Sequence, residues 1–257
     1  MSDDIILETR ALTKEFKGFI AVAKVDLKVR RGSIHALIGP NGAGKTTCFN
    51  LLTKFLKPTS GQIVFDGVDI TGESPAHIAR RGIIRSFQIS SVFPHLSVLE
   101  NVRVALQRQV PTSYHFWRSE RTLDVLNDRA MALLERVDLA SSAGLPAVEL
   151  PYGRKRALEI ATTLAMDPKL MLLDEPTQGM GLEDVDRTRQ LIKRVATDRT
   201  VLMVEHNMSV VASIADTITV LQRGATLAEG PYDQVSRNPA VIEAYMGSAQ
   251  TELQGAH

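Results

Sequence analysis

The chain has 257 residues, of which 44% are hydrophobic and 23% are charged, and its formal net charge is +1. This length suits one large α/β domain or a core with an added subdomain, and the near-zero charge argues against nucleic acid as an electrostatic partner. The single cysteine, Cys48, excludes an internal disulfide and is expected to be a small buried side chain. Because no apolar run approaches the roughly 18 residues that span a bilayer, and the acidic N-terminus is unlike a signal peptide, we expect a soluble chain that meets a membrane only through a partner.

The first part of the chain predicts an antiparallel sheet. Apolar residues alternate over 5–10 and 25–30, as in half-buried strands, and a hairpin-like pair is expected at 62–66 and 68–70. Between these pairs lies a continuous apolar run at 33–38, which predicts a fully buried strand. We therefore expect the antiparallel strands to flank a separate main core.

A glycine-rich turn follows the strand at 33–38 and precedes a helical pattern at 47–55. Strand, glycine-rich turn and helix form the context in which Gly-x-x-x-x-Gly-Lys-Thr binds phosphate. Glycine lets the backbone adopt positive φ and point several N–H groups into one concavity, and the helix adds the positive end of its dipole. The predicted nucleotide-binding residues of this turn are Gly39, Pro40, Asn41, Gly42, Ala43, Gly44, Lys45, Thr46 and Thr47.

Side chains at the end of this turn have separate expected tasks. Lys45 can reach the β- and γ-phosphates of a nucleoside triphosphate, and the Thr46 hydroxyl can ligate Mg²⁺. Thr47 is expected to make a weaker phosphate contact. The sequence therefore predicts a protein that binds a nucleoside triphosphate.

The middle of the chain changes to helical periodicity. A short helix is expected at 75–81 and a strand at 83–87, ending at Gln88, after which helices dominate from about 95 to 165. A strongly helical pattern covers 122–138.

Local signals mark the start of one helix and a segment of unusual composition in this helical part. Ser97 and Glu100 have the spacing of a capping box, which predicts the start of a helix. The segment 107–121 carries aromatic side chains among basic ones. It is either a contact surface for a partner or an ordinary variable insertion, since surface loops tolerate insertions.

The last third of the chain predicts a parallel βαβ unit. Continuous apolar runs fit strands buried on both faces, and the pattern between the first and second of these runs, at 183–195, fits a crossover helix. These two runs lie at 170–173 and 200–205, and a further pair of strands, at 218–221 and 226–229, is expected to flank the turn Arg223-Gly224. Two short helices are expected to close the chain, the last at 239–246, with a frayed polar tail from Gly247.

Polar residues follow several predicted strands at their carboxyl ends. Gly39, Gln88, Asp174 and His206 each come directly after a strand, and ligands of open α/β sheets collect at that edge. Asp174 is suited to hold Mg²⁺, directly or through water, and Glu175 can act as base or orienter for a water that attacks a γ-phosphate. His206 can donate a hydrogen bond to the γ-phosphate and sense its presence. These residues predict a nucleotide-hydrolysing site.

Together these segments resemble an ABC-transporter ATPase subunit over essentially the whole chain. The segments that carry this resemblance, in the family's order, are 39–46, Gln88, 150–156, 170–176 and His206. Within that superfamily the chain most resembles the ATP-binding subunits of branched-chain amino-acid importers. The features behind this narrower resemblance are Glu175-Pro-Thr-Gln-Gly-Met, Val204-Glu-His-Asn-Met208, the long 104–121 insertion and the ending at 241–247.

The resemblance implies an α/β fold: a P-loop NTPase core with a mainly parallel sheet, a flanking antiparallel β-subdomain and a helical subdomain. All three would form a single ABC ATPase domain at 5–250. Residues 1–87 and 166–250 would form the nucleotide-binding core, and the helical subdomain at 88–165 would present the groove for transmembrane subunits.

The resemblance also implies a function and partners. The chain would be a motor subunit that hydrolyses ATP with Mg²⁺ in a head-to-tail homodimer or heterodimer. It would bind transmembrane permease subunits at the cytoplasmic face of the inner membrane. A solute-binding protein would be an indirect partner. Gln88 would contact the metal and link the ATP site to the helical segment. Phe16 matches the aromatic position that stacks on adenine, although it could equally belong to the core.

The signature segment departs from the family's usual Leu-Ser-Gly-Gly-Gln. Here it is formed by Leu150, Pro151, Tyr152, Gly153 and Arg154. In the family, the serine hydroxyl and a glycine N–H bind the γ-phosphate of ATP held by the partner. Pro151 has neither group, so that contact is lost, whereas Gly153 can still bring backbone close to phosphate. Pro151 suits the first turn of a helix, so the local fold need not suffer.

Arg154 has two interpretations. It compensates by facing the partner's γ-phosphate, or it belongs to a solvated basic face with Lys155 and Arg156, whose charges oppose the helix dipole. A third possibility is that the chain pairs with a different ATPase subunit, which leaves one composite site weak. The segment 179–182 also departs from the common Ser-Ala-Leu-Asp.

Other functions remain as alternatives. Within the family, the main one is an export ATPase of the lipopolysaccharide type, which has the same chemistry. A soluble ABC ATPase acting on DNA or the ribosome is disfavoured because the chain lacks a second cassette, a coiled-coil insertion and a basic patch. A non-hydrolysing regulatory subunit is suggested only by Pro151, and Glu175 argues against it. The sequence does not identify the solute, since specificity in such importers lies in the binding protein and permeases.

Overall fold

The computed structural model describes residues 4–86, 92–107 and 126–254. Its strands are β1 (Ile5–Phe16), β2 (Phe19–Arg30), β3 (Ile34–Ile38), β4 (Ser60–Phe65), β5 (Val68–Asp69), β6 (Ile83–Arg85), β7 (Leu170–Asp174), β8 (Thr200–Val204), β9 (Thr217–Gln222) and β10 (Ala225–Gly230). Its α-helices are α1 (Lys45–Leu52), α2 (Pro75–Arg81), α3 (Val98–Gln107), α4 (Asn127–Arg136), α5 (Tyr152–Ala165), α6 (Leu182–Val195), α7 (Met208–Ile214), α8 (Tyr232–Val235) and α9 (Pro239–Gln254). Short 3-10 turns lie at Ala140–Ser142 and Ala147–Glu149.

The strands form two sheets, as the sequence predicts. A 4-stranded antiparallel sheet has the order β2-β1-β4-β5, and a 6-stranded sheet has the order β10-β9-β3-β8-β7-β6. In the larger sheet the pairs from β9 to β6 are parallel, and β10 is an antiparallel edge strand. The predicted α/β fold class, with a mainly parallel sheet beside an antiparallel one, is confirmed.

Alternating side chains of the central parallel strands pack into two separate hydrophobic cores. In β7, Leu170 and Leu172 pack with α1 and the antiparallel sheet, whereas Met171 and Leu173 pack against the helices on the opposite face. Because side chains of a strand alternate between its faces, a strand covered on both sides must be apolar throughout. This is why the continuous apolar runs of the sequence are strands of the parallel sheet.

Helix α1 lies between the two sheets and holds the single cysteine. Cys48 is fully buried, and burial raises the pKa of its thiol to about 12. The prediction of a small buried side chain is therefore confirmed. At this pKa the thiol stays protonated and unreactive at neutral pH.

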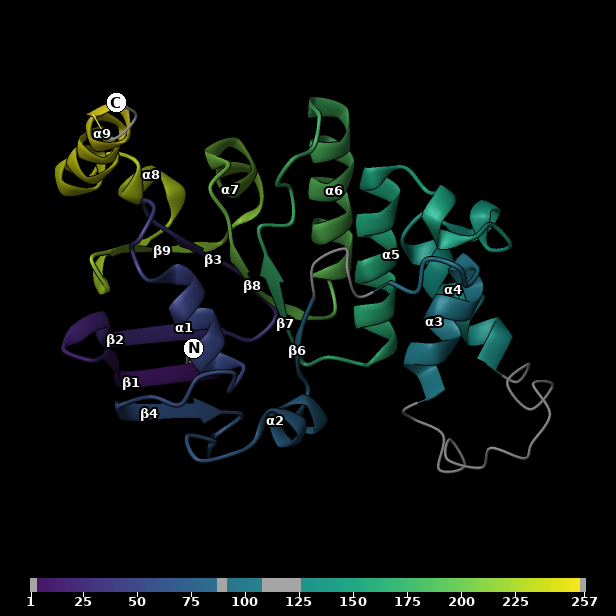
Figure 1. Cartoon of the computed structure of the whole chain (residues 1–257), viewed down its shortest axis with the longest axis horizontal. Helices are drawn as coiled ribbons and strands as arrows, with labels where there is room; N and C mark the ends of the chain where they lie inside the picture. The colour runs from purple at the N-terminus through teal and green to yellow at the C-terminus, as the bar shows by residue number, and fades with distance from the viewer. Residues whose placement is uncertain (1–3, 87–91, 108–125, 255–257) are drawn as a thin grey trace.

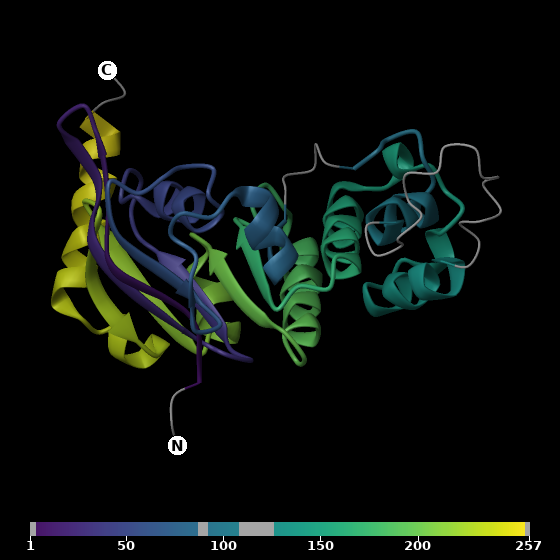
Figure 2. The same cartoon turned by 90° about the horizontal axis from the view of Figure 1, so that it is seen from below.

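The helices are distributed unevenly along the molecule (Figures 1 and 2). Helices α3, α4 and α5 gather beyond β6 and β7 at one end, whereas α8 and α9 lie at the other, beside β9 and β10. The capping box at the start of α3 is confirmed, since the Ser97 N–H donates to Glu100 Oε2 at 2.7 Å and the Glu100 N–H donates to Ser97 Oγ at 3.1 Å. The division into a core and a helical subdomain at 88–165 stays a prediction.

The structure corrects the predicted end of the last helix, and it does not describe Gln88 or most of the 107–121 segment. The predicted end of the last helix at residue 246 is wrong, because α9 continues to Gln254. Gly247 costs a helix only about 1 kcal/mol, and the residues after it include several good helix formers. Gln88 and most of the 107–121 segment, with its predicted contact surface, lie outside the described residues.

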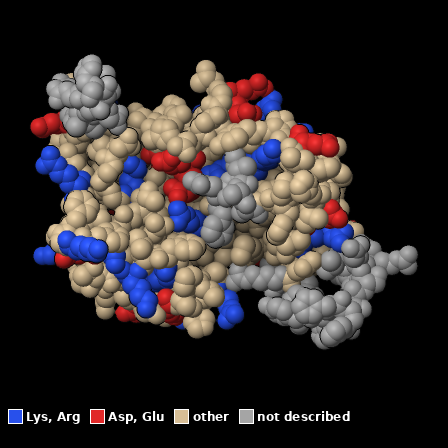
Figure 3. Space-filling model, viewed as in Figure 1, with Lys and Arg blue, Asp and Glu red and all other residues tan. Residues whose placement is uncertain are grey.

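The surface carries both charge signs. On the face in Figure 3, Lys and Arg side chains are interspersed with Asp and Glu, which fits the net charge of +1. Among the described residues no helix is both long enough and apolar enough to cross a bilayer.

Candidate nucleotide-binding site

The predicted site residues come together because their strands are neighbours. Strands β3, β8, β7 and β6 lie side by side and parallel, so their carboxyl ends meet at one edge of the sheet. Gly39 follows β3, Asp174 ends β7 and His206 follows β8. The structure therefore places these three at one edge, where ligands of such sheets bind.

Two glycines of the phosphate loop are required by close backbone contacts. Gly39 has φ +149°, and a Cβ there would lie 2.2 Å from the carbonyl oxygen of Leu221 in β9. Gly44, which precedes α1, has φ +98°, and its Cβ would lie 2.5 Å from the carbonyl oxygen of Ala21. The loop is thus pressed against neighbouring backbone, which only glycine permits.

We expect Gly39→Ala to lower the free energy of unfolding by about 2–4 kcal/mol, because backbone must move to admit the methyl group. Gly18→Ala is the matched control: φ is +90° at Gly18, but no atom lies within 4 Å of the added Cβ. Gly18→Ala should lower the free energy of unfolding by only about 1 kcal/mol, the cost of holding alanine at positive φ. Urea denaturation measures both, and equal losses would contradict the packing argument.

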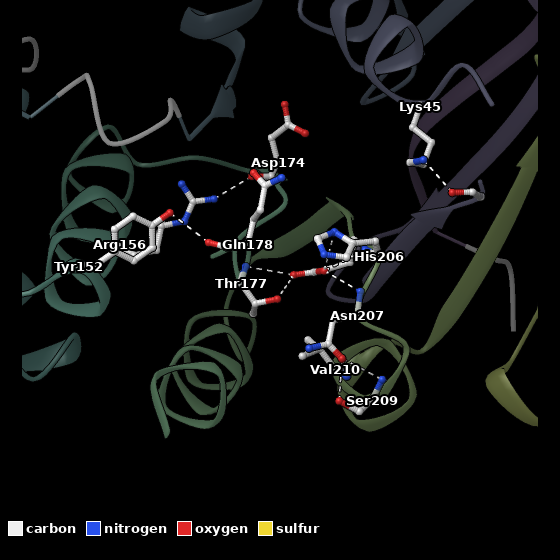
Figure 4. Close-up of polar contacts among 12 residues, drawn as sticks. Lys45, Tyr152, Arg156, Asp174, Thr177, Gln178, His206, Asn207, Ser209 and Val210 are labelled. Atoms are coloured by element: carbon white, nitrogen blue, oxygen red, sulfur yellow. Dashed lines mark hydrogen bonds and ion pairs between the residues drawn. The ribbon is translucent and has the colours of Figure 1, made fainter. Parts of the chain in front are cut away.

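The lysine of the loop is buried and bonded only to backbone in the described residues. Lys45 is 8% exposed, and its Nζ donates to the carbonyl oxygens of Gly39 at 2.7 Å and Pro40 at 3.0 Å; Figure 4 draws one of these two bonds. Burial lowers the pKa of the ammonium, and the nearby Glu175 carboxylate partly opposes this. Thr46 is exposed in the first turn of α1. A buried cation in a glycine-lined turn at a helix start suits an anionic ligand.

Asp174 is held by arginines from two other elements. Its carboxylate Oδ2 accepts a hydrogen bond from Arg85 of β6, and its backbone oxygen accepts one from Arg156 Nη2 of α5 at 2.8 Å (Figure 4 shows the second). Arg85 also donates to Asn50 Oδ1 in α1 at 2.7 Å. The sequence reasoning missed Arg85, because nothing in its local pattern marks it; only its position before Gln88 at the end of a strand places it near the edge.

Glu175 has unusual backbone geometry for a non-glycine residue. Its φ is +44°, in the left-handed region, which costs roughly 1–2 kcal/mol. Two hydrogen bonds hold it there: its N–H donates to the Val204 oxygen at 2.9 Å, and its oxygen accepts from the Gln178 N–H at 3.1 Å. Strain retained beside a strand end that carries polar side chains is typical of functional positions.

His206 presents its ring to solvent. Its side chain is 56% exposed, and its backbone N–H donates to Glu205 Oε2 at 2.9 Å. The imidazole is therefore available to a ligand at this edge, while its backbone is fixed.

The signature segment begins a helix in the way that its proline suggests. Pro151 is the N-cap of α5, and its oxygen accepts the Lys155 N–H at 2.9 Å. Leu150 before it is buried. Gly153 lies against α6, since an added Cβ would come within 2.6 Å of the Asp184 carboxylate.

Two other signature side chains contact their own chain. The Tyr152 hydroxyl donates to the Gln178 oxygen at 3.0 Å (Figure 4), and Arg154 Nη1 donates to Ser142 Oγ at 2.9 Å. Arg154 is thus partly buried against the 3-10 turn at Ala140–Ser142, instead of lying on a fully solvated face.

Phe16 lies at the end of β1 and is not a core residue. It is 41% exposed, and Lys14 Nζ lies 4.9 Å from its ring centroid. The alternative that placed it in the core is therefore wrong, and the Lys14 side chain lies over one face of its ring.

Comparison with known proteins identifies the group to which this architecture is similar. The family model described as ABC transporter matches residues 22–178, and the model described as branched-chain amino acid ATP-binding cassette transporter matches 225–250. The high-affinity branched-chain amino acid transport ATP-binding protein BraF of Pseudomonas aeruginosa is 41% identical, covering 95% of this chain and 98% of the relative. LivG of Escherichia coli K12, with the same description, is 38% identical over 95% and 98%.

Solved structures agree with these sequence matches. The ADP conformation of an ATP-binding cassette of an ABC transporter superposes with a TM-score of 0.83 at 30% identity, covering 95% of this chain and 99% of the other. A nucleotide-free ATP-binding cassette from an ABC transporter gives a TM-score of 0.82 at 29% identity, covering 94% and 98%.

Proposed function

Because the chain belongs to the ABC transporter family of ATP-binding subunits, within its branched-chain amino acid group, we propose that it is the motor that drives import of branched-chain amino acids. It is an ATPase of that family. The observation that carries the proposal is the meeting of the phosphate loop, Asp174 and His206 at one sheet edge, in a chain whose 225–250 segment matches the branched-chain model. The export and non-transport alternatives have no comparable support.

The residues at this edge have different roles in ATP hydrolysis. Lys45 and the loop amides bind phosphate, and the Lys45 ammonium exchanges its carbonyl partners for phosphate oxygens. Glu175 orients or deprotonates the attacking water. His206 donates a hydrogen bond to the γ-phosphate from its exposed ring, and Gln88 links the site to the helical segment.

The donor set at this edge also fits Mg²⁺. Thr46 supplies an exposed hydroxyl, and the Asp174 carboxylate already has a cation, Arg85, as its neighbour. Thr46, Asp174 and Gln88 would hold the metal. When bound, Mg²⁺ supplies charge neutralisation on the β- and γ-phosphates. Among the described residues, no group of three or more His, Cys, Asp or Glu forms a metal site by itself.

The proposed assembly follows the family. The chain works as a dimer in which the signature segment Leu150–Arg154 of one subunit faces the ATP of the other. It docks on transmembrane permease subunits at the cytoplasmic face of the inner membrane, and a solute-binding protein delivers the amino acid. Phe16 stacks on adenine with the ring face that Lys14 does not cover.

Arg154 provides a test of the altered signature. The Arg154 guanidinium is bonded to Ser142 within the same chain, so we expect Arg154→Ala and Ser142→Ala to change ATP turnover by less than about twofold. A hydrogen bond contributes about 1 kcal/mol to stability, and we expect only a small part of that to change the activation free energy. Both variants remove the same bond from opposite ends. A steady-state ATPase assay in which only Arg154→Ala loses activity would instead support a contact to the partner's γ-phosphate.

Transport is tested in cells that lack the gene for this chain. We expect uptake of radiolabelled leucine, isoleucine and valine to fall and to return with the wild-type gene, but not with Lys45→Ala. Uptake of an unrelated solute, such as a sugar, is the control. Unchanged uptake of all three amino acids, with the permease genes intact, would contradict the proposed substrate class while leaving the ATPase intact.

A further inference from the structure

A buried carboxylate connects the two turns that follow β7 and β8. Glu205 has 0% exposure and comes directly after β8. Its Oε1 accepts hydrogen bonds from the Thr177 N–H at 3.0 Å and from the Thr177 hydroxyl. Its Oε2 accepts from the N–H groups of His206 at 2.9 Å and Asn207 at 3.0 Å. In Figure 4, dashed lines from Thr177 and from the backbone at His206 and Asn207 mark these hydrogen bonds.

This carboxylate is stabilised by neutral donors. His206 Nδ1 lies 4.0 Å from Glu205 Oε2, on a ring that is largely exposed. A buried charge is costly unless hydrogen bonds satisfy its oxygens, and here each oxygen receives two. An apolar residue would fill the space without that cost, so the bonds serve to fix the geometry of the turns they join.

The joined turns carry residues of the proposed mechanism. Thr177 lies two residues after Glu175, and Glu205 immediately precedes His206. We infer that Glu205 is a positioning residue, which holds the Glu175 turn and the His206 turn at a fixed separation so that both act on the same γ-phosphate. This inference rests on the roles proposed for Glu175 and His206.

A second contact fixes the same turn from the opposite side. The Tyr152 hydroxyl donates to the Gln178 oxygen, one residue after the bonds to Thr177. The turn at 175–178 is therefore held between the start of α5 and Glu205 (Figure 4). These contacts form a continuous chain from the signature helix through this turn to the backbone of His206.

The test uses the full chain and compares Glu205→Gln, Thr177→Val and the double variant. In Glu205→Gln an NH₂ group replaces one carboxylate oxygen and faces N–H donors, so the bonds to that oxygen are lost. Thr177→Val removes only the hydrogen bond from the Thr177 hydroxyl to Glu205. Glu135→Gln, an exposed position on α4, is the matched control. Steady-state assays give kcat and KM for ATP, and thermal unfolding reports folding.

We expect Glu205→Gln to lower kcat at least tenfold with KM within about twofold of wild type. Thr177→Val should lower kcat by a smaller factor, and the double variant should fall no further than Glu205→Gln, because both act through one link. Losses of kcat that multiply in the double variant, or a kcat within twofold of wild type in both single variants, would overturn the inference. If Glu205→Gln does not fold, Thr177→Val decides: a kcat loss at unchanged KM supports the link, and wild-type kcat overturns it.

His206→Ala separates this inference from the proposed function. A loss of kcat in His206→Ala together with wild-type kcat in Glu205→Gln and Thr177→Val would retain the histidine's role and overturn the positioning role. Full turnover in His206→Ala would remove the proposed role of the histidine and overturn the inference that depends on it.

Discussion

Glu175→Gln is expected to lower ATP turnover by about 10²-fold or more while ATP binding persists. A glutamine amide has nearly the shape of the carboxylate but cannot take a proton from water, and general-base catalysis contributes about 10²–10⁴-fold. The backbone at φ +44° is unaffected by this change, so the turn keeps its two hydrogen bonds to Val204 and Gln178. A steady-state ATPase assay and a titration with a fluorescent ATP analogue measure the two effects. Turnover within threefold of wild type would contradict a direct role for Glu175.

The same variant reports the oligomeric state. With hydrolysis blocked, ATP and Mg²⁺ should hold the dimer closed, and the mass in solution should double on adding both. Glu135→Gln is the matched control and should turn over ATP normally. A nucleotide-dependent dimer shows that the Pro151 signature still closes on ATP in a homodimer. A monomer that binds ATP would instead indicate a second ATPase subunit as the partner.

Lys45→Ala is expected to weaken ATP binding by about 10- to 100-fold. Hydrogen bonds to charged groups contribute about 1.5–3 kcal/mol, and each 1.4 kcal/mol corresponds to a factor of ten. The ammonium is already buried and directed at the carbonyl oxygens of Gly39 and Pro40, so little side-chain order has to be gained when phosphate binds.

Stability should change differently from binding in Lys45→Ala. Burial lowers the pKa of this ammonium, which shows that the folded chain holds the charge at a cost. We therefore expect the free energy of unfolding without nucleotide to fall by less than about 1 kcal/mol or to rise. Lys57→Ala, at an exposed position after α1, is the control and should leave both quantities unchanged. Wild-type nucleotide affinity in Lys45→Ala would contradict the assignment of the phosphate loop.

Local patterns were sufficient to predict the strand, turn and helix of the proposed phosphate loop. The strand β3, the glycine turn and helix α1 are consecutive, so their composition predicts their geometry, and the apolar runs of β7 and β8 follow from burial on both faces. Helix ends were less predictable. The last helix passes Gly247 because the cost of one glycine is small compared with the residues that continue the helix.

The sequence by itself determined the fold class, the family and the phosphate loop, because each depends on residues close together in the chain or on motifs in a fixed order. Tertiary structure alone decided which strands are neighbours and which side chains meet. Arg85 reaches Asp174, and Glu205 reaches Thr177, across 89 and 28 positions of sequence. Phe16 is exposed because it pairs with Phe19 at the turn between β1 and β2, beyond the last residue of β1 that pairs with β4. Such contacts depend on how the strands pack, and no local periodicity records that packing.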